Sequence, residues 1–233
     1  MNGAQQQAFE DDLASLPAGS LDFLQQAGAT IGFIDGRLTL EDHTGERLSV
    51  NLAPSHGRPP LLKAALAGGA IKPLVADATA GMAGDAFDLA HAGCAVVAFE
   101  RSPLVWLLLR DGLFRAGQDP QLAAAAARIE LHHGDAAALL PQHGPFDVVV
   151  LDPMWQGGKG SAGKRKSMRL FHELAGPPSD EAALLEAARG VALRRVVAKR
   201  PARGPFLAGV KPSGSLTGRT VRFDLYAPIA DQS

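Results

Sequence analysis

The sequence has few cysteines, few aromatic residues and no long apolar run. Its 233 residues include one cysteine, and aromatic residues make up 6% of the chain. The single cysteine, Cys94, excludes an internal disulfide and a cysteine-built zinc site, and we expect it to be a small core residue. No stretch approaches 18 uninterrupted apolar residues, which argues against a membrane-spanning helix. Residues 1–7 lack the pattern of a secretory signal, so we expect a cytoplasmic protein.

Charge is balanced overall but unevenly distributed. The formal net charge is −1, and 46% of the residues are apolar, enough for a sizeable core. Residues 153–223 hold 14 Lys and Arg against 4 Asp and Glu, whereas the rest of the chain holds 9 against 20. This segregation favours one face built for a polyanion, and a solvated basic surface is the alternative.

Residues 1–73 are predicted to form a small N-terminal subdomain. Residues 31–34 and 37–40 flank Asp35-Gly36, a pair typical of the two-residue turn of a β-hairpin. Residues 46–52 predict a third strand. Residues 54–60 contain several helix and strand breakers, and a short linker helix is expected over residues 61–66.

From residue 74 to residue 233 the pattern predicts strands that alternate with helices. The predicted strands cover residues 74–78, 95–100, 129–131, 146–152 and 194–199, and the predicted helices cover residues 84–91, 103–116, 121–127 and 180–191. This order predicts an α/β fold with an open, mainly parallel, Rossmann-like sheet that has helices on both faces. Ligands of such sheets bind outside the carboxyl ends of the strands.

The turn after the first of these strands has the features of a nucleoside site. Asp77 ends the strand, and Gly81 and Gly84 allow the backbone to pass close to a ligand, with Asp85 at the start of the helix. Glu100 ends the next strand at a spacing suited to a ribose. Because the glycines do not form G-x-G-x-x-G, a dinucleotide is disfavoured. S-adenosylmethionine (SAM), with its sulfonium and ammonium charges, fits an acidic pocket without phosphate contacts.

Asp135 follows the third strand, where it would meet the adenine amino group. The preceding His132 and His133 have no partner at metal-ligand spacing. We therefore interpret both histidines as structural and expect no metal site.

Asp152-Pro153-Met154-Trp155 follows a strongly apolar strand and predicts the chemistry. An exocyclic amine on a nucleobase is a poor nucleophile, because its lone pair is spread into the ring. The Asp152 carboxylate and the Pro153 carbonyl would accept hydrogen bonds from the two N–H groups of this amine. Trp155 would stack on the flipped base. The pattern therefore predicts a methyltransferase that acts on a nucleobase.

A flexible, basic segment follows directly and is predicted to contact RNA phosphates. Two cations at the end of the fifth strand would border the same opening. The predicted RNA contacts are Lys159, Lys164, Arg165, Lys166, Arg169, Lys199 and Arg200.

Taken together, these motifs resemble the ribosomal RNA small subunit methyltransferase J family. The resemblance runs in order over about residues 74–227 and is thinner over the first 50. It is carried by residues 77–81, 100–101, 151–154, 168–171, 199–201 and 222–226. It implies methyl transfer from SAM to the N2 of a guanine in 16S rRNA, with the rRNA or the small ribosomal subunit as partner.

The resemblance also implies a set of cofactor contacts. By position they fall on Gly84, Asp85, Glu100, Arg101, Asp135, Ala136 and Asp152. Three departures stand out. Gly84 stands where arginine is common in the family, and Asp135 and Ala136 stand where small hydroxyl residues are usual. Trp155 replaces phenylalanine, which preserves the stacking face.

Two alternatives remain open from the sequence. The first is a SAM-dependent methyltransferase for a different substrate, because one fold serves many functions. The second is a non-catalytic RNA-binding module on a methyltransferase scaffold, against which the retained Asp77, Glu100 and Asp152 argue.

Overall fold

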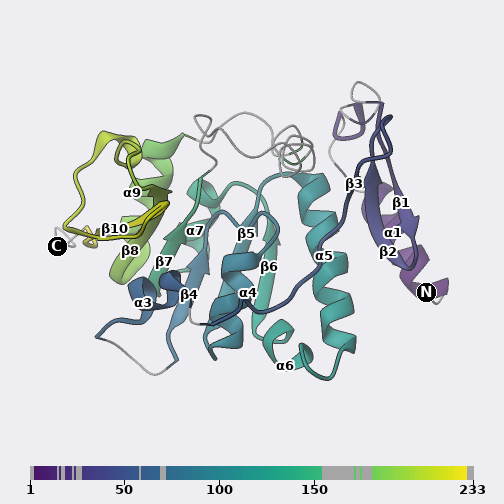
Figure 1. The fold of residues 1–233 in the computed structure, drawn as a ribbon. Coiled ribbons are helices and arrows are strands. Elements are labelled where there is room, and N and C mark those ends of the chain that lie inside the picture. The colour runs from purple at the N-terminus through teal and green to yellow at the C-terminus, as the bar shows by residue number, and fades with distance from the viewer. Residues whose placement is uncertain are drawn as a thin grey trace.

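The structure, a computed structural model, contains two β-sheets flanked by helices (Figure 1). It describes residues 3–14, 16, 19–22, 24, 28–57, 59–68, 72–153, 171, 174 and 180–229. None of the helices within these ranges is both long enough and apolar enough to cross a bilayer.

The predicted hairpin is confirmed in a small antiparallel sheet near the N-terminus. The sheet has the order β1–β2–β3, with β1 over Thr30–Ile34, β2 over Arg37–Glu41 and β3 over Arg47–Leu48. Asp35 and Gly36 in the turn have φ values of 50° and 73°. Both residues therefore take the left-handed conformation that this two-residue turn requires.

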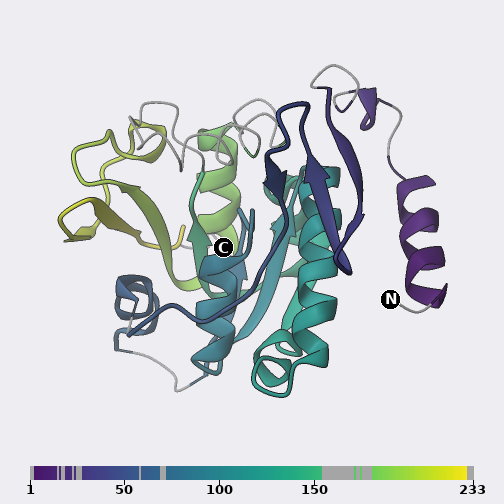
Figure 2. The same ribbon diagram turned by 45° about the vertical axis from the view of Figure 1, so that its right-hand side comes forward.

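The third strand is shorter than the prediction of residues 46–52, because Val50 packs against a helix instead of continuing the sheet. Its carbonyl accepts a hydrogen bond from the Arg115 side chain, and a Cβ added at Gly112 would lie 2.5 Å from its Cγ1. Gly112 and Arg115 belong to α5 (Pro103–Gln118), which contacts β2 (Figure 2). The buried residues of the small sheet thus join the same hydrophobic core as α5. The division after residue 73 stays a prediction.

The predicted Rossmann-like sheet is confirmed, with seven strands in the order β6–β5–β4–β7–β8–β10–β9. Five strands are parallel, and β10 is antiparallel to both β8 and β9. Their bounds are β4 Leu74–Asp77, β5 Ala95–Glu100, β6 Ile129–His133, β7 Phe146–Leu151, β8 Ala192–Pro201, β9 Gly214–Thr217 and β10 Val221–Tyr226. The chain leaves β4 toward β6 and returns through β7 on the other side. The carboxyl ends of β4 and β7 therefore form the switch point at which such sheets bind ligands.

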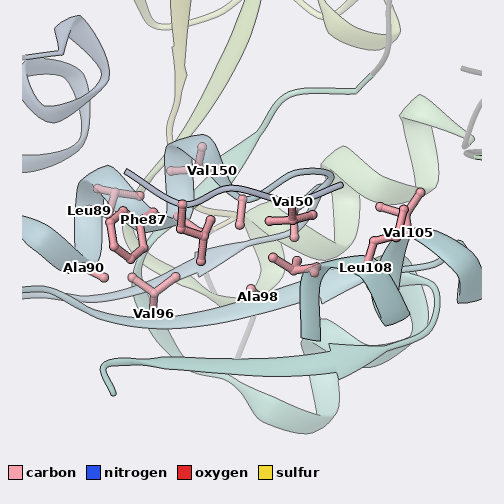
Figure 3. Packing of buried hydrophobic residues seen from close by; sticks show 14 of the residues in the cluster. Val50, Phe87, Leu89, Ala90, Val96, Ala98, Val105, Leu108 and Val150 are labelled. Atoms are coloured by element: carbon pink, nitrogen blue, oxygen red, sulfur yellow. The ribbon is translucent and has the colours of Figure 1, made fainter. Parts of the chain in front are cut away.

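Helices cover both faces of this sheet, which explains why β7 is apolar from Val148 to Leu151. Val148 and Val150 face the core shared with α3, α4 and α5 (Figure 3), whereas Val149 and Leu151 face the core shared with α7 and α9. The remaining helices are α1 Gly3–Ala14, α3 Pro60–Leu66, α4 Gly84–His91, α6 Ala123–Ala126, α7 Ala136–His143, the 3-10 helix η1 Leu207–Gly209 and α9 Glu181–Val191.

Several elements were not among the sequence predictions. The helix α7 contains Pro141, a residue that usually ends helices, and buries only Ala136 and Leu140. Strand β9 is short and mostly exposed, so it carries no apolar pattern. Strand β8 extends beyond the predicted residues 194–199 at both ends because its partners β7 and β10 hold it there.

Candidate active site

A cavity of about 550 Å³ lies at the carboxyl ends of β4, β5, β6, β7 and β8. It brings together the predicted residues from five separate segments of the chain. Its lining includes Asp77, Gly81, Gly84, Asp85, Glu100, Arg101, Asp135, Ala136, Asp152, Pro153, Lys199 and Arg200. This volume suits a nucleoside-sized ligand.

The glycine turn after β4 forms one wall of the cavity. Gly81 has a φ of 51°, and a Cβ there would lie 3.2 Å from the ring of Phe171. Gly84 starts α4 behind Ala83, which supplies no side-chain cap, and a Cβ at Gly84 would meet open space. Gly81 is therefore required by the backbone conformation and by Phe171, whereas at Gly84 there is room for a larger side chain.

The Glu100 carboxylate is buried and held in place by backbone groups. Its two oxygens accept hydrogen bonds from the N–H of Gly81 at 2.9 Å and of Ser102 at 2.7 Å. Burial raises the pKa of Glu100, and the backbone N–H groups oppose that rise. Each carboxylate oxygen has a second lone pair, so Glu100 can still accept hydrogen bonds from two ribose hydroxyls.

Asp77 is 2% exposed and sits among other carboxylates. Burial, followed by the charges of Asp85 and Asp152, raises the pKa of Asp77 to about 7. One oxygen accepts a hydrogen bond from the N–H of Thr79 at 3.1 Å. The cavity thus holds excess negative potential, which a cationic ligand would relieve.

Lys199 connects two of these carboxylates, a role that the sequence prediction missed. Its Nζ lies 3.0 Å from Asp85 Oδ2 and 2.9 Å from Asp152 Oδ2. The backbone N–H of Asp152 also donates to Thr79 Oγ1 at 2.6 Å. Burial raises the pKa of Asp152, and Lys199 opposes this rise. The two carboxylates in turn raise the pKa of Lys199, which stays a cation.

The third strand end also reaches the cavity. Asp135 precedes α7 and its side chain accepts a hydrogen bond from Ala137 N–H at 3.0 Å, so it caps this helix. The same carboxylate is exposed and lines the cavity beside Ala136. Helix capping and a ligand contact are therefore compatible at this residue.

Two residues near the base site differ from the sequence expectation in their setting. Arg200 is 2% exposed and its Nη1 lies 2.8 Å from Glu181 Oε1, so its guanidinium is an interior ion pair with no open surface for a phosphate. Phe171 also lines the cavity, although the sequence analysis named its segment only as part of the family resemblance. Trp155, Lys159, Lys164, Arg165, Lys166 and Arg169 lie outside the described residues.

An open seven-stranded sheet with a glycine turn after β4 and carboxylates at the ends of β4, β5 and β7 is the framework of Rossmann-like methyltransferases. A family model described as "Putative SAM-dependent methyltransferase" matches residues 42–228, and the chain belongs to this family of SAM-dependent methyltransferases. The predicted resemblance to the ribosomal RNA small subunit methyltransferase J family is confirmed by relatives that carry this name.

Two such relatives and one solved structure illustrate the similarity. The protein named Ribosomal RNA small subunit methyltransferase J from Neisseria meningitidis is 49% identical over 160 residues, which cover 67% of this chain and 64% of the relative. The protein of that name from Laribacter hongkongensis is 47% identical over 167 residues, covering 71% and 59%. The chain thus spans less than two thirds of the length of these relatives. A crystal structure of a SAM-dependent methyltransferase from Neisseria gonorrhoeae is 33% identical, with a TM-score of 0.73 over 97% of this chain and 94% of that chain.

Proposed function

We propose that this protein transfers a methyl group from SAM to the exocyclic N2 of a guanine in small-subunit (16S) ribosomal RNA. The observation that carries the proposal is the place of Asp152: its carboxylate lies at the end of β7 in the same cavity as Glu100 and Asp77. The family and the names of the relatives support the donor and the class of substrate.

The residues of the cavity fit SAM. Glu100 retains acceptor sites for the ribose hydroxyls, and Asp135 would accept from the adenine amino group. The carboxylates of Asp77 and Asp85 lie where they would stabilise the sulfonium and ammonium charges. When bound, SAM supplies an electrophilic methyl group. Arg101 and Ala136 are assigned as further contacts from the family resemblance and their place in the lining.

The base would lie over Asp152 and Pro153. The Asp152 carboxylate and the Pro153 carbonyl would each accept a hydrogen bond from one N–H group of the amine. These two bonds would aim the nitrogen lone pair at the methyl group. Trp155, in the following segment, would stack on the base. Holding the two reacting atoms in line can remove up to about 7 to 11 kcal/mol of a barrier.

Lys199 and Asp152 together account for the proton that the amine loses. The Lys199 ammonium holds the Asp152 carboxylate at 2.9 Å and opposes the rise in its pKa that burial causes, which favours the ionised form. As the N–C bond forms, the bond between the methyl carbon and the donor sulfur would break, leaving a neutral thioether. The proton released from the nitrogen would pass to Asp152, the acceptor for that N–H group. The Asp152 side chain is 42% exposed, so it can return the proton to solvent.

The RNA would reach the cavity from the side of β8 and the basic segment that follows Asp152. We retain Lys159, Lys164, Arg165, Lys166 and Arg169 as proposed phosphate contacts. Lys199 is assigned instead to the carboxylates, and Arg200 to holding Glu181, because their side chains are engaged there. A cytoplasmic location and an N-terminal subdomain over residues 1–73 complete the proposal.

The test is to incubate the protein with isotopically labelled SAM and unmodified small-subunit rRNA or subunits, and to map the labelled nucleotide by mass spectrometry. We expect one labelled guanine that carries the methyl group on N2. Label on another base or another guanine atom would contradict the N2 assignment. No label on rRNA or subunits, with SAM bound, would contradict the substrate class.

A further inference from the structure

Most cations of the C-terminal part of the chain are committed to partners inside the protein. Residues 180–229 contain nine Lys and Arg. Six of these side chains donate to carboxylates or backbone carbonyls: Arg189, Arg194, Arg195, Lys199, Arg200 and Arg222. The other three, Arg203, Lys211 and Arg219, are exposed and form no ion pair or side-chain hydrogen bond with the residues that the structure describes. Among the cations of this part of the chain, these three are therefore the ones whose side chains make no bond to described residues.

Two of the three lie together at the rim of the cavity. Val221 at the start of β10 pairs with Pro201 at the end of β8, and Ala202 N–H donates to the Thr220 carbonyl. Arg203 directly follows Ala202 and Arg219 directly precedes Thr220, so both arginines lie next to this hydrogen bond. Pro201, Thr220 and Val221 all line the cavity. Lys211, by contrast, lies near the opposite end of β10, because Ser213 N–H donates to the Leu225 carbonyl.

The turn that carries Arg203 is hydrogen-bonded to a buried ion pair. Arg222 is fixed by Asp224 through two bonds of 2.7 and 2.8 Å. Its Nη1 donates to the carbonyls of Ala202 and Gly204, one on each side of Arg203. The Asp224 side chain is fully buried, so this arrangement costs desolvation that a mere surface turn would not require. The buried pair thus fixes the backbone on both sides of an unpaired arginine.

The second arginine is presented by a tight turn. The Gly218 N–H donates to the Val221 carbonyl at 2.8 Å, so Arg219 lies in the short connection from β9 to β10. Two positive side chains on neighbouring turns repel each other, and an anion between them would be stabilised. Guanidinium groups bind phosphate oxygens in a bidentate manner.

We propose that Arg203 and Arg219 form a phosphate-binding pair that grips the RNA backbone beside the target base. This proposal rests on the proposed function, because it takes RNA as the substrate at the adjacent cavity. The pair is separate from the basic segment after Asp152, because Arg203 follows β8 and Arg219 lies between β9 and β10. It would fix the position of the backbone at the rim, while the base enters past Pro201 and Val221.

The test compares the double variant Arg203→Ala/Arg219→Ala with Lys211→Ala, which removes a matched exposed cation at the far end of β10. Binding of unmodified small-subunit RNA is measured at several salt concentrations, and SAM affinity by calorimetry. Each lost phosphate contact lowers the slope of log K against log salt by about 0.7 to 0.9. We therefore expect the double variant to bind RNA on the order of 20- to 60-fold more weakly at about 0.1 M salt, with SAM affinity unchanged. The Lys211→Ala variant is expected to match the wild type.

The outcomes separate this proposal from the proposed function. An unchanged salt slope in a double variant that still methylates RNA would overturn the pair and leave the function intact. A wild type that binds RNA but transfers no methyl group, together with a reduced slope in the double variant, would support the pair and refute the function. Equal losses in the double variant and in Lys211→Ala would also overturn the pair, because the effect would then be general charge.

Discussion

The carboxyl edge of the seven-stranded sheet has two halves of opposite charge. The ends of β4, β5 and β7 carry Asp77, Glu100 and Asp152, whereas the turns after β8 and before β10 carry Arg203 and Arg219. The difference matches two different ligands, since a small cationic donor suits the acidic half and a polyanionic acceptor suits the basic half. Lys199 is the junction, because it is a cation of β8 that binds carboxylates of the acidic half.

The largest effect is expected from Asp152→Ala, which removes the carboxylate that faces both halves. We expect methyl transfer to fall about 10³-fold, within the range that a positioned acid or base contributes. Single-turnover kinetics with labelled SAM measure the chemical step directly. The fold is expected to persist, because the bond from the residue-152 N–H to Thr79 Oγ1 involves only the backbone at that position.

The Asp152→Asn variant sharpens the same comparison. It keeps one acceptor oxygen and the side-chain volume but loses the charge that Lys199 binds. We expect activity between that of Asp152→Ala and the wild type. Wild-type turnover in Asp152→Ala would refute the proposed chemistry.

The next largest effect is expected from Asp77→Asn, which relieves the excess negative charge of the acidic half. The pKa of Asp77 is about 7 in the folded protein, against an ordinary value of 3.8 for an aspartate. Between these pH values the folded state binds the extra proton, so the free energy of unfolding of the wild type falls as pH rises from about 4 to about 7. The loss is on the order of 4 kcal/mol, and it is absent in Asp77→Asn.

Urea denaturation of both proteins at several pH values without SAM measures this difference. Other titrating groups are shared by the two proteins, so their contributions largely cancel in the comparison. We expect the variant to gain stability relative to the wild type from about pH 4 to about pH 7 and to gain nothing more above about pH 8. A difference in the free energy of unfolding that does not change with pH would contradict the raised pKa of the buried Asp77 carboxyl.

Much of the fold was predictable because its elements have strong local signals. Strand β7 is apolar on both faces, and Asp35-Gly36 fixes the hairpin. Elements whose stability comes from distant partners were not predictable. Residues 49–52 have a strand-like apolar alternation, yet Arg115 binds the Val50 carbonyl from α5. No local pattern could indicate this contact over 65 residues of sequence separation.

The site was predictable in its residue types but not in its pairings. Acidic residues at strand ends can be recognised as site residues from the sequence, because parallel strands bring their carboxyl ends to one edge of the sheet. The cations at the end of β8 border the cavity as predicted, but Lys199 and Arg200 are paired there with carboxylates of the same chain. Whether a cation faces solvent depends on what the fold places next to it, and only the structure shows that.

The smallest of these effects is expected from Lys199→Met, which removes the junction itself. Without the ammonium, the rise that burial causes in the pKa of Asp152 loses its main opposition, so a larger fraction of the carboxyl is protonated. We expect turnover at pH 7 to fall and the acid limb of the kcat profile to move to higher pH.

The pH profile separates this role from a purely structural one. In Lys199→Met we expect activity to recover toward the wild-type value at high pH, because Asp152 then ionises without help. Lys199→Arg keeps the charge and is expected to restore most of the activity at pH 7, whereas Lys211→Met, at an exposed position far from the cavity, is expected to change nothing. A uniform loss at every pH in Lys199→Met would mean that Lys199 acts through packing alone, and the two halves of the edge would then be electrostatically independent.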